Sequence, residues 1–327
     1  MLNFLVGGCG IGKTYGVKKH CLQQFEKKEE QFIFIRRNKT EYLKKVANFF
    51  APYTDDEDAH FKKDWSVSKD GTFLCKGKVG GYYASLSELM AKGDEYPGVA
   101  NIFFDEFIVH GGYQRYLPDE FNCFLGAVDS ICRYKREVHA YLCANAVSLY
   151  NPYFLELGYQ YNGKEFWAPK SKDNTGLAND SLVEWCENGE LAQKLAQTRF
   201  GRLIKGTKYG DYSLYNKSLR ENEDFIKKKT AYCKLLSIFL VNGIEYGIWR
   251  DINTGYFYWS NSKGNGCNER YSITDLDKQV GYLSIRALRN TALWMMFVRA
   301  FDFGQVYFDD ALCKAACFET LRKGWGA

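Results

Sequence analysis

Long apolar runs, histidine and closely spaced cysteines are scarce in this sequence of 327 residues. No uninterrupted apolar stretch reaches the roughly 18 residues that a membrane-spanning helix needs, and the first residues do not form a basic segment followed by a cleavable apolar one. The 11 cysteines form no CxxC pair and only 4 histidines are present, so the ligand spacing typical of a metal site is absent. We therefore expect a cytoplasmic protein that has no membrane partner.

The net charge of +5 is small but unevenly distributed. Apolar residues make up 46% of the chain and charged residues 25%, a mixture typical of a globular protein with ample core. The net charge is −2 over residues 1–195, +5 over 196–229 and +2 over 230–327, and we predict domain boundaries at these positions. The basic middle segment either meets the phosphates of a nucleic acid or is the solvated surface of a linker.

A glycine-rich loop follows directly after the apolar run of residues 2–6. Its residues are Gly7, Gly8, Cys9, Gly10, Ile11, Gly12, Lys13 and Thr14. Glycines let the chain wrap so tightly that several backbone N–H groups point at phosphates, and the helix that begins here adds the partial positive charge of its N-terminus. Lys13 then faces the β- and γ-phosphates, and Thr14 supplies a hydroxyl for Mg²⁺. The alternative is a glycine turn that binds no ligand.

Apolar periodicity predicts an α/β fold for the first part of the chain. Strands are expected at 2–6, 32–35, 101–104 and 138–143, helices at 13–25, 39–50 and 118–132, and short strands around turns at 70–71 and 80–81 within 65–85. From residue 230 onward the pattern predicts a smaller α+β domain, an antiparallel meander followed by helices. Its strands are expected at 235–240, 246–249 and 256–259, its turns at 242–243 and 253–255, and its helices at 283–303 and 309–323.

Two acids end the apolar strand at 101–104, at the edge of a parallel sheet where ligands bind. Asp105 would hold Mg²⁺ through water, and Glu106 would polarise the attacking water as a general base. Two acids at a strand end are also common as a helix cap or a solvated turn. A glutamate in this place suits hydrolysis better than transfer by a kinase. GTP is disfavoured because the nearest match to a guanine-reading NKxD element, residues 38–41, ends in glutamate.

Two further residues are candidates for contact with the γ-phosphate. Asn145 follows the strand at 138–143, where additional-strand ATPases carry a polar residue that senses the γ-phosphate and orients water. Asparagine is also a common residue of strand-end turns. Arg133 ends the helix before that strand, so it could reach the γ-phosphate of a neighbouring subunit or could complement the helix dipole alone.

Several collinear motifs together resemble those of one family. They are residues 7–14, 31–39 (QFIFIRRNK), 96–97 (YP), 104–107 (FDEF), 145–148 (NAVS), 151–154 (NPYF) and 198–204 (TRFGRLI). With these motifs the chain resembles the DNA-packaging ATPase, or encapsidation protein, of phi-29-like tailed bacteriophages, a terminase-like motor. The resemblance runs from residue 2 to about 215 and continues more weakly through 247–253.

The resemblance implies a ring-forming ATPase, usually pentameric, that pumps double-stranded DNA into an empty prohead. The implied fold is an additional-strand (RecA-like, ASCE) P-loop ATPase domain at 1–195, a short linker at 196–229 and a C-terminal domain at 230–327 that resembles a vestigial RNase H-like nuclease without activity. The implied cofactors are ATP and Mg²⁺. The implied partners are double-stranded DNA, the prohead with its portal, further copies of the chain and, optionally, a packaging RNA. Such a motor works in the host cytoplasm and transiently at the portal vertex.

The resemblance also implies roles for single residues. Lys13 and Thr14 bind phosphate and Mg²⁺, Asp105 holds the metal and Glu106 is the catalytic glutamate. Arg133 matches the arginine finger that the family supplies to the neighbouring subunit.

Three more basic residues match the family by position. Lys92 matches a basic residue offered across the subunit interface, while Arg36 and Lys39 match residues that couple the nucleotide state to the lid and to DNA. Lys92 and Lys39 could alternatively be solvated lysines. Two other functions stay open on the residues alone. One is a different ring translocase of the helicase or recombinase type, and the other is a binding module in which slow ATP turnover only sets a conformation.

Overall fold

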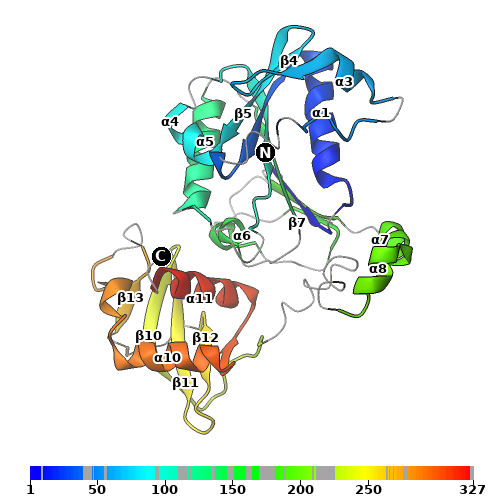
Figure 1. Ribbon diagram of the computed structural model, residues 1–327. Helices are drawn as coiled ribbons and strands as arrows, with labels where there is room; N and C mark the ends of the chain where they lie inside the picture. Colours follow the sequence, from blue (N-terminus) through cyan, green and yellow to red (C-terminus); the bar gives the residue numbers. More distant parts are fainter. Residues whose placement is uncertain are drawn as a thin grey trace. The chain divides into compact units, whose positions relative to one another are not determined.

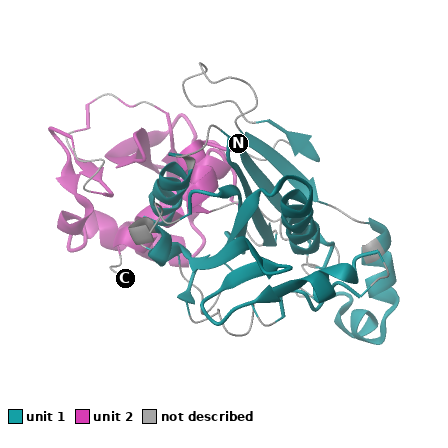
Figure 2. Ribbon diagram, turned by 90° about the horizontal axis from the view of Figure 1, so that it is seen from above, with its two compact units in different colours: residues 1–147, 162–218 teal, residues 148–161, 219–327 magenta. Residues whose placement is uncertain are grey.

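Two separately packed units make up the chain, and Figure 2 shows them in different colours. The first comprises residues 1–147 and 162–218, and the second comprises 148–161 and 219–327. This computed structural model describes residues 1–8, 10–39, 46, 48–54, 57–92, 96–109, 116–117, 119–133, 137–145, 151–159, 164–168, 181–186, 189–207, 210, 225–262, 264, 266–267, 269–274 and 279–324. Residues 148–161, inside the first predicted domain, thus group with the second unit, while the boundaries at 195 and 229 stay a prediction.

A nine-stranded sheet forms the centre of the described part of the first unit, in the order β3-β4-β5-β2-β6-β7-β1-β9-β8. Its strands are β1 (Leu2–Gly7), β2 (Gln31–Arg36), β3 (Trp65–Val67), β4 (Thr72–Cys75), β5 (Lys78–Ser85), β6 (Val99–Asp105), β7 (His139–Asn145), β8 (Phe166–Trp167) and β9 (Ser181–Cys186). The six strands from β5 to β9 in this order are parallel, and β3, β4 and β8 add antiparallel edges. The predicted strands of this unit are confirmed.

Helices cover both faces of this sheet (Figure 1). The described helices are α1 (Lys13–Lys28), α3 (His60–Asp64), α4 (Leu86–Lys92), α5 (Glu120–Cys132), α7 (Gly189–Gln197) and α8 (Arg199–Ile204). Neighbouring residues of β6 point to opposite faces: Phe103 belongs to the core cluster under α1, while Phe104 stacks on Phe124 of α5. Burial on both faces explains why the central strands are continuous apolar runs. The predicted helix at 39–50 lies mostly outside the described residues.

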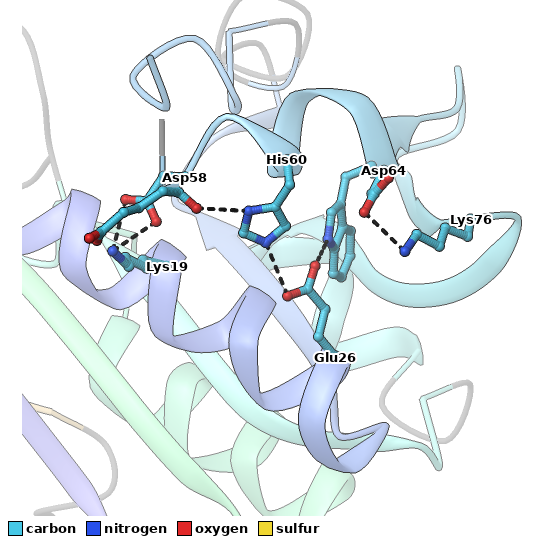
Figure 3. Close-up of polar contacts among 8 residues, drawn as sticks. Lys19, Glu26, Asp58, His60, Asp64 and Lys76 are labelled. Atoms are coloured by element: carbon cyan, nitrogen blue, oxygen red, sulfur yellow. Dashed lines mark hydrogen bonds and ion pairs between the residues drawn. The ribbon is translucent and has the colours of Figure 1, made fainter. Parts of the chain in front are cut away.

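Polar contacts fasten the segment around α3 to α1, the helix that follows the glycine-rich loop (Figure 3). Asp58 accepts a hydrogen bond from Lys19 Nζ at 2.8 Å. About two turns further along α1, Glu26 accepts a hydrogen bond from Trp65 Nε1 at 2.9 Å and lies 3.4 Å from His60 Nε2. These contacts hold α1 at two points along its length, so the loop is attached to a fixed helix.

The predicted turn at residues 80–81 is wrong, because both glycines lie inside β5. The turn lies at Lys76 and Gly77, which have φ values of 49° and 84°. A Cβ atom at Gly80 would lie 2.5 Å from the ring of Trp65, and one at Gly81 would lie 2.7 Å from the ring of Phe32. The glycine pair therefore permits close packing of aromatic rings on the strand rather than a reversal of the chain.

A second sheet, in the order β14-β13-β10-β11-β12-β15, forms the described part of the second unit. Its strands are β10 (Cys233–Val241), β11 (Ile244–Asp251), β12 (Phe257–Ser260), β13 (Arg270–Ser272), β14 (Leu283–Ser284) and β15 (Val306–Phe308), and its helices are α6 (Pro152–Leu157), α10 (Ala292–Asp302) and α11 (Ala311–Gly324). β10, β11 and β12 are antiparallel neighbours, as predicted. The first turn is confirmed at Asn242 and Gly243, both with positive φ.

The predicted helix at 283–303 needs correction. Residues 283–284 form β14 and 285–287 a short 3₁₀ turn, so that α10 begins only at Ala292. Two hydroxyl side chains set these starts: Ser284 accepts a hydrogen bond from Arg286 N, and Thr291 accepts one from Trp294 N at 3.2 Å. Such caps end the preceding conformation and begin a new helix. Among the described helices, none is long and apolar enough to cross a membrane.

Gly80→Ala should destabilise the first unit by about 1–3 kcal/mol, because the added methyl group meets the buried ring of Trp65. Gly126→Ala is the matched control: it lies within α5, where a Cβ atom meets nothing within 4 Å, so it should stabilise by about 0.5–1 kcal/mol. Urea unfolding followed by circular dichroism measures both. Equal effects of the two changes would contradict the packing role of Gly80.

Candidate nucleotide-binding site

The glycine-rich loop joins β1 to α1 as the sequence predicts. Gly10 and Gly12 have φ values of 79° and 94°, which side-chain-bearing residues rarely adopt. A Cβ atom at Gly7 would lie 2.1 Å from the carbonyl oxygen of Cys186 in the adjacent β9, so glycine is required there too. Cys9 lies outside the described residues. The backbone is thus shaped to bring N–H groups close to an anion at the start of α1.

Lys13 lies across the opening of this loop. Its Nζ donates hydrogen bonds to the carbonyl oxygens of Gly7 at 3.1 Å and Gly8 at 2.5 Å, and it is 3.4 Å from Oδ1 of Asn145. An ammonium group in this position fits the terminal phosphates of a nucleoside triphosphate. The contact with Asn145 brings the end of β7 to the same place, as the sequence predicts.

The two predicted Mg²⁺ ligands are in direct contact. Thr14 Oγ1 donates a hydrogen bond of 2.9 Å to Oδ1 of Asp105 at the end of β6. A hydroxyl and a carboxylate oxygen are ligands that Mg²⁺ prefers, so the residues present fit the ion. Burial raises the pKa of the Asp105 carboxyl, and the neighbouring Arg36 guanidinium opposes that rise. A divalent cation beside Asp105 would favour its charged form further.

Glu106 has an unusual backbone conformation. Its φ is 63°, which costs a residue with a side chain about 1–2 kcal/mol. Its N–H donates a hydrogen bond of 2.8 Å to the carbonyl oxygen of Cys143 in β7, and the N–H of Phe107 donates to the same oxygen at 3.2 Å. These two bonds fix the turn after β6, and a strained residue held in this way is a common property of functional sites.

Arg36, at the end of β2, binds both acids. Its Nη1 donates to Oδ2 of Asp105 at 2.9 Å, and its Nη2 donates to Oε2 of Glu106 at 2.6 Å. The Arg36 side chain is 2% exposed, whereas that of Glu106 is 36% exposed. The arginine is therefore a buried, fixed partner, and the glutamate is its more accessible one.

The remaining predicted residues are Lys39, Lys92 and Arg133, and the contact described for Lys39 lies outside this cluster. Lys39 Nζ donates at 2.5 Å to Oε1 of Glu88 in α4, and the side chain of Lys39 is exposed. The side chain of Lys92, in the last turn of α4, lies outside the described part of the structure. Arg133 is exposed directly after α5.

Sequence reasoning missed a second arginine. Arg37, next to Arg36, forms a buried ion pair with Glu120, the first residue of α5. The signal available in the sequence was the doublet Arg36–Arg37 at the end of a strand, because successive strand residues face opposite sides of a sheet. Its partner lies 83 residues further along the chain, and no spacing rule connects the two.

The loop, Lys13, Thr14 and the acids at the end of β6 define a P-loop ATPase domain, here followed by a C-terminal unit. The chain belongs to the Podovirus DNA encapsidation protein (Gp16) family, whose model matches residues 1–325. It is 32% identical over 324 residues to a DNA packaging protein of Bacillus phage phi29, covering 99% of this chain and 94% of the relative. A DNA packaging protein of Bacillus phage B103 is 30% identical over 324 residues, covering 99% and 97%. The resemblance found in the sequence is confirmed.

Solved structures agree with this assignment. The bacteriophage phi-29 viral genome packaging motor assembly contains a chain that matches with a TM-score of 0.71 and 32% identity, covering 99% of this chain and 95% of the other. The Phi-28 gp11 DNA packaging motor matches with a TM-score of 0.64 and 18% identity, covering 100% and 95%. The second likeness concerns the fold alone.

Lys13→Met should weaken ATP binding about tenfold or more, because Lys13 is the one positively charged side chain of residues 7–14 and is expected to contact the phosphates. Isothermal titration calorimetry with ATP and Mg²⁺ measures the change. Lys27→Met, an exposed lysine in the last turn of the same helix, is the control and should bind like the unchanged protein. Equal Kd values for Lys13→Met and Lys27→Met would rule out this position of the phosphates.

Proposed function

We propose that this chain is the ATP-hydrolysing motor of viral genome packaging, which moves double-stranded DNA into a preformed prohead. The observation that carries the proposal is the cluster of Lys13, Thr14, Asp105 and Glu106 within a chain that matches the encapsidation family over its length. ATP is the fuel and Mg²⁺ the cofactor. DNA, the prohead and its portal are the partners, with a packaging RNA as an optional one.

The residues of this chain divide the chemistry among them. The loop N–H groups and Lys13 neutralise the phosphates, and Thr14 with Asp105 holds Mg²⁺, which screens phosphate charge when bound. Glu106 accepts the proton of the attacking water. Asn145, beside Lys13, orients that water and the γ-phosphate, because an amide both donates and accepts hydrogen bonds.

Arg36 controls when Glu106 can act as a base. A carboxylate that accepts a charge-assisted hydrogen bond from a guanidinium is a poor proton acceptor, so Glu106 must leave Arg36 Nη2 before it takes a proton from water. Arg36 also binds Asp105, which holds the metal in this proposal. A change in the bound nucleotide therefore acts on Arg36 through Asp105. Arg36 then either releases the carboxylate of Glu106 or keeps it bound.

Activation by the neighbouring subunit completes the site. Arg133 is exposed after α5, and we assign it to the γ-phosphate of the next subunit in a homo-oligomeric ring, which is pentameric in this proposal. Lys92 is offered across the same interface, and Lys39 links the nucleotide state to the lid. Hydrolysis then depends on assembly, and the motor works in the host cytoplasm and transiently at the portal vertex.

Two finer assignments of fold support this mechanism. β7 lies between β1 and β6, which is the arrangement expected of an additional-strand, RecA-like ATPase. In the second unit the order β12-β11-β10-β13-β14 combines an antiparallel meander with two parallel strands, which supports an RNase H-like domain. Neither β10 nor β13 contains an acid, and the two acids of β11, Glu245 and Asp251, lie at its opposite ends. We therefore assign this unit to docking on DNA or the portal rather than to cleavage.

Glu106→Gln and Arg133→Ala should each lower steady-state ATP hydrolysis about a hundredfold or more, because one removes the base and the other removes the charge supplied in trans. A coupled phosphate-release assay, with and without double-stranded DNA and proheads, measures this. Lys78→Ala, which breaks an exposed ion pair with Glu29, is the control and should hydrolyse normally.

The same assay separates the rival functions. DNA- and prohead-stimulated hydrolysis that is lost in both variants supports the packaging motor. Stimulation by DNA without any effect of proheads would favour another ring translocase, and packaging that survives Glu106→Gln would favour a nucleotide-gated binding module.

The protein should not cleave DNA. Two-metal hydrolysis needs several acids converging on the ions, and no such group of metal ligands occurs among the described residues. Supercoiled plasmid incubated with the protein and Mg²⁺ or Mn²⁺ should stay supercoiled on an agarose gel. Nicking that disappears when Asp251 and Asp309 are changed to asparagine would overturn this assignment.

A further inference from the structure

A buried ion pair joins the end of β2 to the start of α5. Arg37 donates from Nε to Oε2 of Glu120 at 2.7 Å and from Nη2 to Oε1 at 2.9 Å, and the two side chains are 4% and 0% exposed. Glu120 Oε2 also accepts a hydrogen bond from the N–H of Leu117 at 2.8 Å. The guanidinium lies over the rings of Phe104 and Tyr116. The carboxylate of Glu120 and the two aromatic rings together fix the position of the Arg37 guanidinium.

The same guanidinium contacts the turn after β6 that contains Glu106 and Phe107, which we call the catalytic turn. Arg37 Nη2 donates at 2.9 Å to the carbonyl oxygen of Phe107, the residue that follows Glu106. Arg36 meanwhile binds the side chain of Glu106 from the other face of β2. Arg36, the last residue of β2, and Arg37, the residue after it, therefore hold the side chain of Glu106 and the backbone just after it.

α5 leads from this ion pair to Arg133. The helix has 13 residues, from Glu120 to Cys132, and is about 20 Å long. Phe124 stacks on Phe104 of β6, and Ala127 and Ile131 are buried, so one face of the helix is packed along its length. A packed helix moves as a rigid body, so a displacement of Glu120 is carried to the residue that follows Cys132.

We propose that Arg37 and Glu120 are a positioning pair that couples each subunit's own catalytic turn to the arginine finger it presents to the next subunit. The pair contacts neither nucleotide nor reacting atoms and acts through α5 on Arg133. The nucleotide state at Glu106 of one subunit thereby sets the position of that subunit's finger and the rate of the following site. This inference rests on the proposed activation in trans.

Mixed assemblies of two variants test the proposal. Acceptor subunits carry Arg133→Ala and keep a complete site of their own, while donor subunits carry Glu106→Gln and keep their finger. Neither hydrolyses well alone, so hydrolysis in the mixture reports donor fingers acting on acceptor sites. The pair is then replaced by Arg37→Met with Glu120→Gln, which removes both charges together and keeps an acceptor for Leu117 N–H, because removing one partner alone leaves a buried charge.

Placed in the donor, the double change should reduce hydrolysis by the mixture about tenfold or more, because misplacing a catalytic group by an ångström has effects of this size. Placed in the acceptor, it should reduce hydrolysis less, since the acceptor has no finger to position. ATP binding to the donor should be unchanged. Arg37→Lys, which keeps the charge but loses the two-pronged contact, should give an intermediate loss.

Asn122→Ala in the donor is the matched control. It removes an exposed hydrogen bond to Asp119, the N-cap residue of the same helix, and leaves the ion pair and the packed face of α5 in place, and thermal unfolding checks that the variants are folded. Equal losses in donor and acceptor, or an equal loss with Asn122→Ala, would overturn the proposal in favour of a merely structural pair. A second outcome concerns donors that carry Glu106→Gln but keep the Arg37–Glu120 pair. If their mixture with acceptors hydrolyses ATP no faster than the separate components, activation in trans is refuted, and the positioning role with it.

Discussion

The site depends on one buried guanidinium, that of Arg36, which lies between the two acids at the end of β6. Asp105 is itself almost buried, and burial opposes its charge. Lys13 and Arg36 together balance Asp105 and Glu106, so the cluster carries no net formal charge. Two adjacent carboxylates, of which Asp105 is buried, would be costly without this arginine. Arg36 therefore makes the acidic pair possible and at the same time binds one carboxylate oxygen of Glu106.

The order of the strands determines which residues can meet there. β7 between β1 and β6 places Asn145 beside Lys13, and β2 beside β6 places Arg36 beside the acids. Arg36, Asp105 and Asn145 each end their strand, at the carboxyl edge of the sheet where ligands of open parallel sheets bind. The glycine-rich loop alone would bind phosphates, and the neighbouring strand ends add the groups that make hydrolysis possible.

The sequence predicted the loop, the two acids and Asn145 because each lies next to a recognisable strand, and local pattern is enough for that. Prediction from the sequence failed where the role of a residue depends on a partner that is distant in the chain. The glycines at 80 and 81 looked like a turn, but Trp65 and Phe32 explain them. The pairing of Arg37 with Glu120 spans 83 residues, and no local sequence pattern predicts it. The run at 283–303 has one apolar helical pattern, yet the hydroxyl of Thr291 starts the helix late.

Three basic residues, Arg36, Arg37 and Lys39, lie at or just after the end of β2, and their burial decides which of them can transmit force. The ion pair of Lys39 with Glu88 is exposed, so solvent screens it and it contributes little. Arg36 and Arg37 are both buried, and breaking a buried pair costs about 3–5 kcal/mol, more than the 1–3 kcal/mol or so typical of coupling between sites. Because Arg36, which ends β2, binds the acids and Arg37, the next residue, binds α5, neither the acids nor α5 can shift independently of the end of β2.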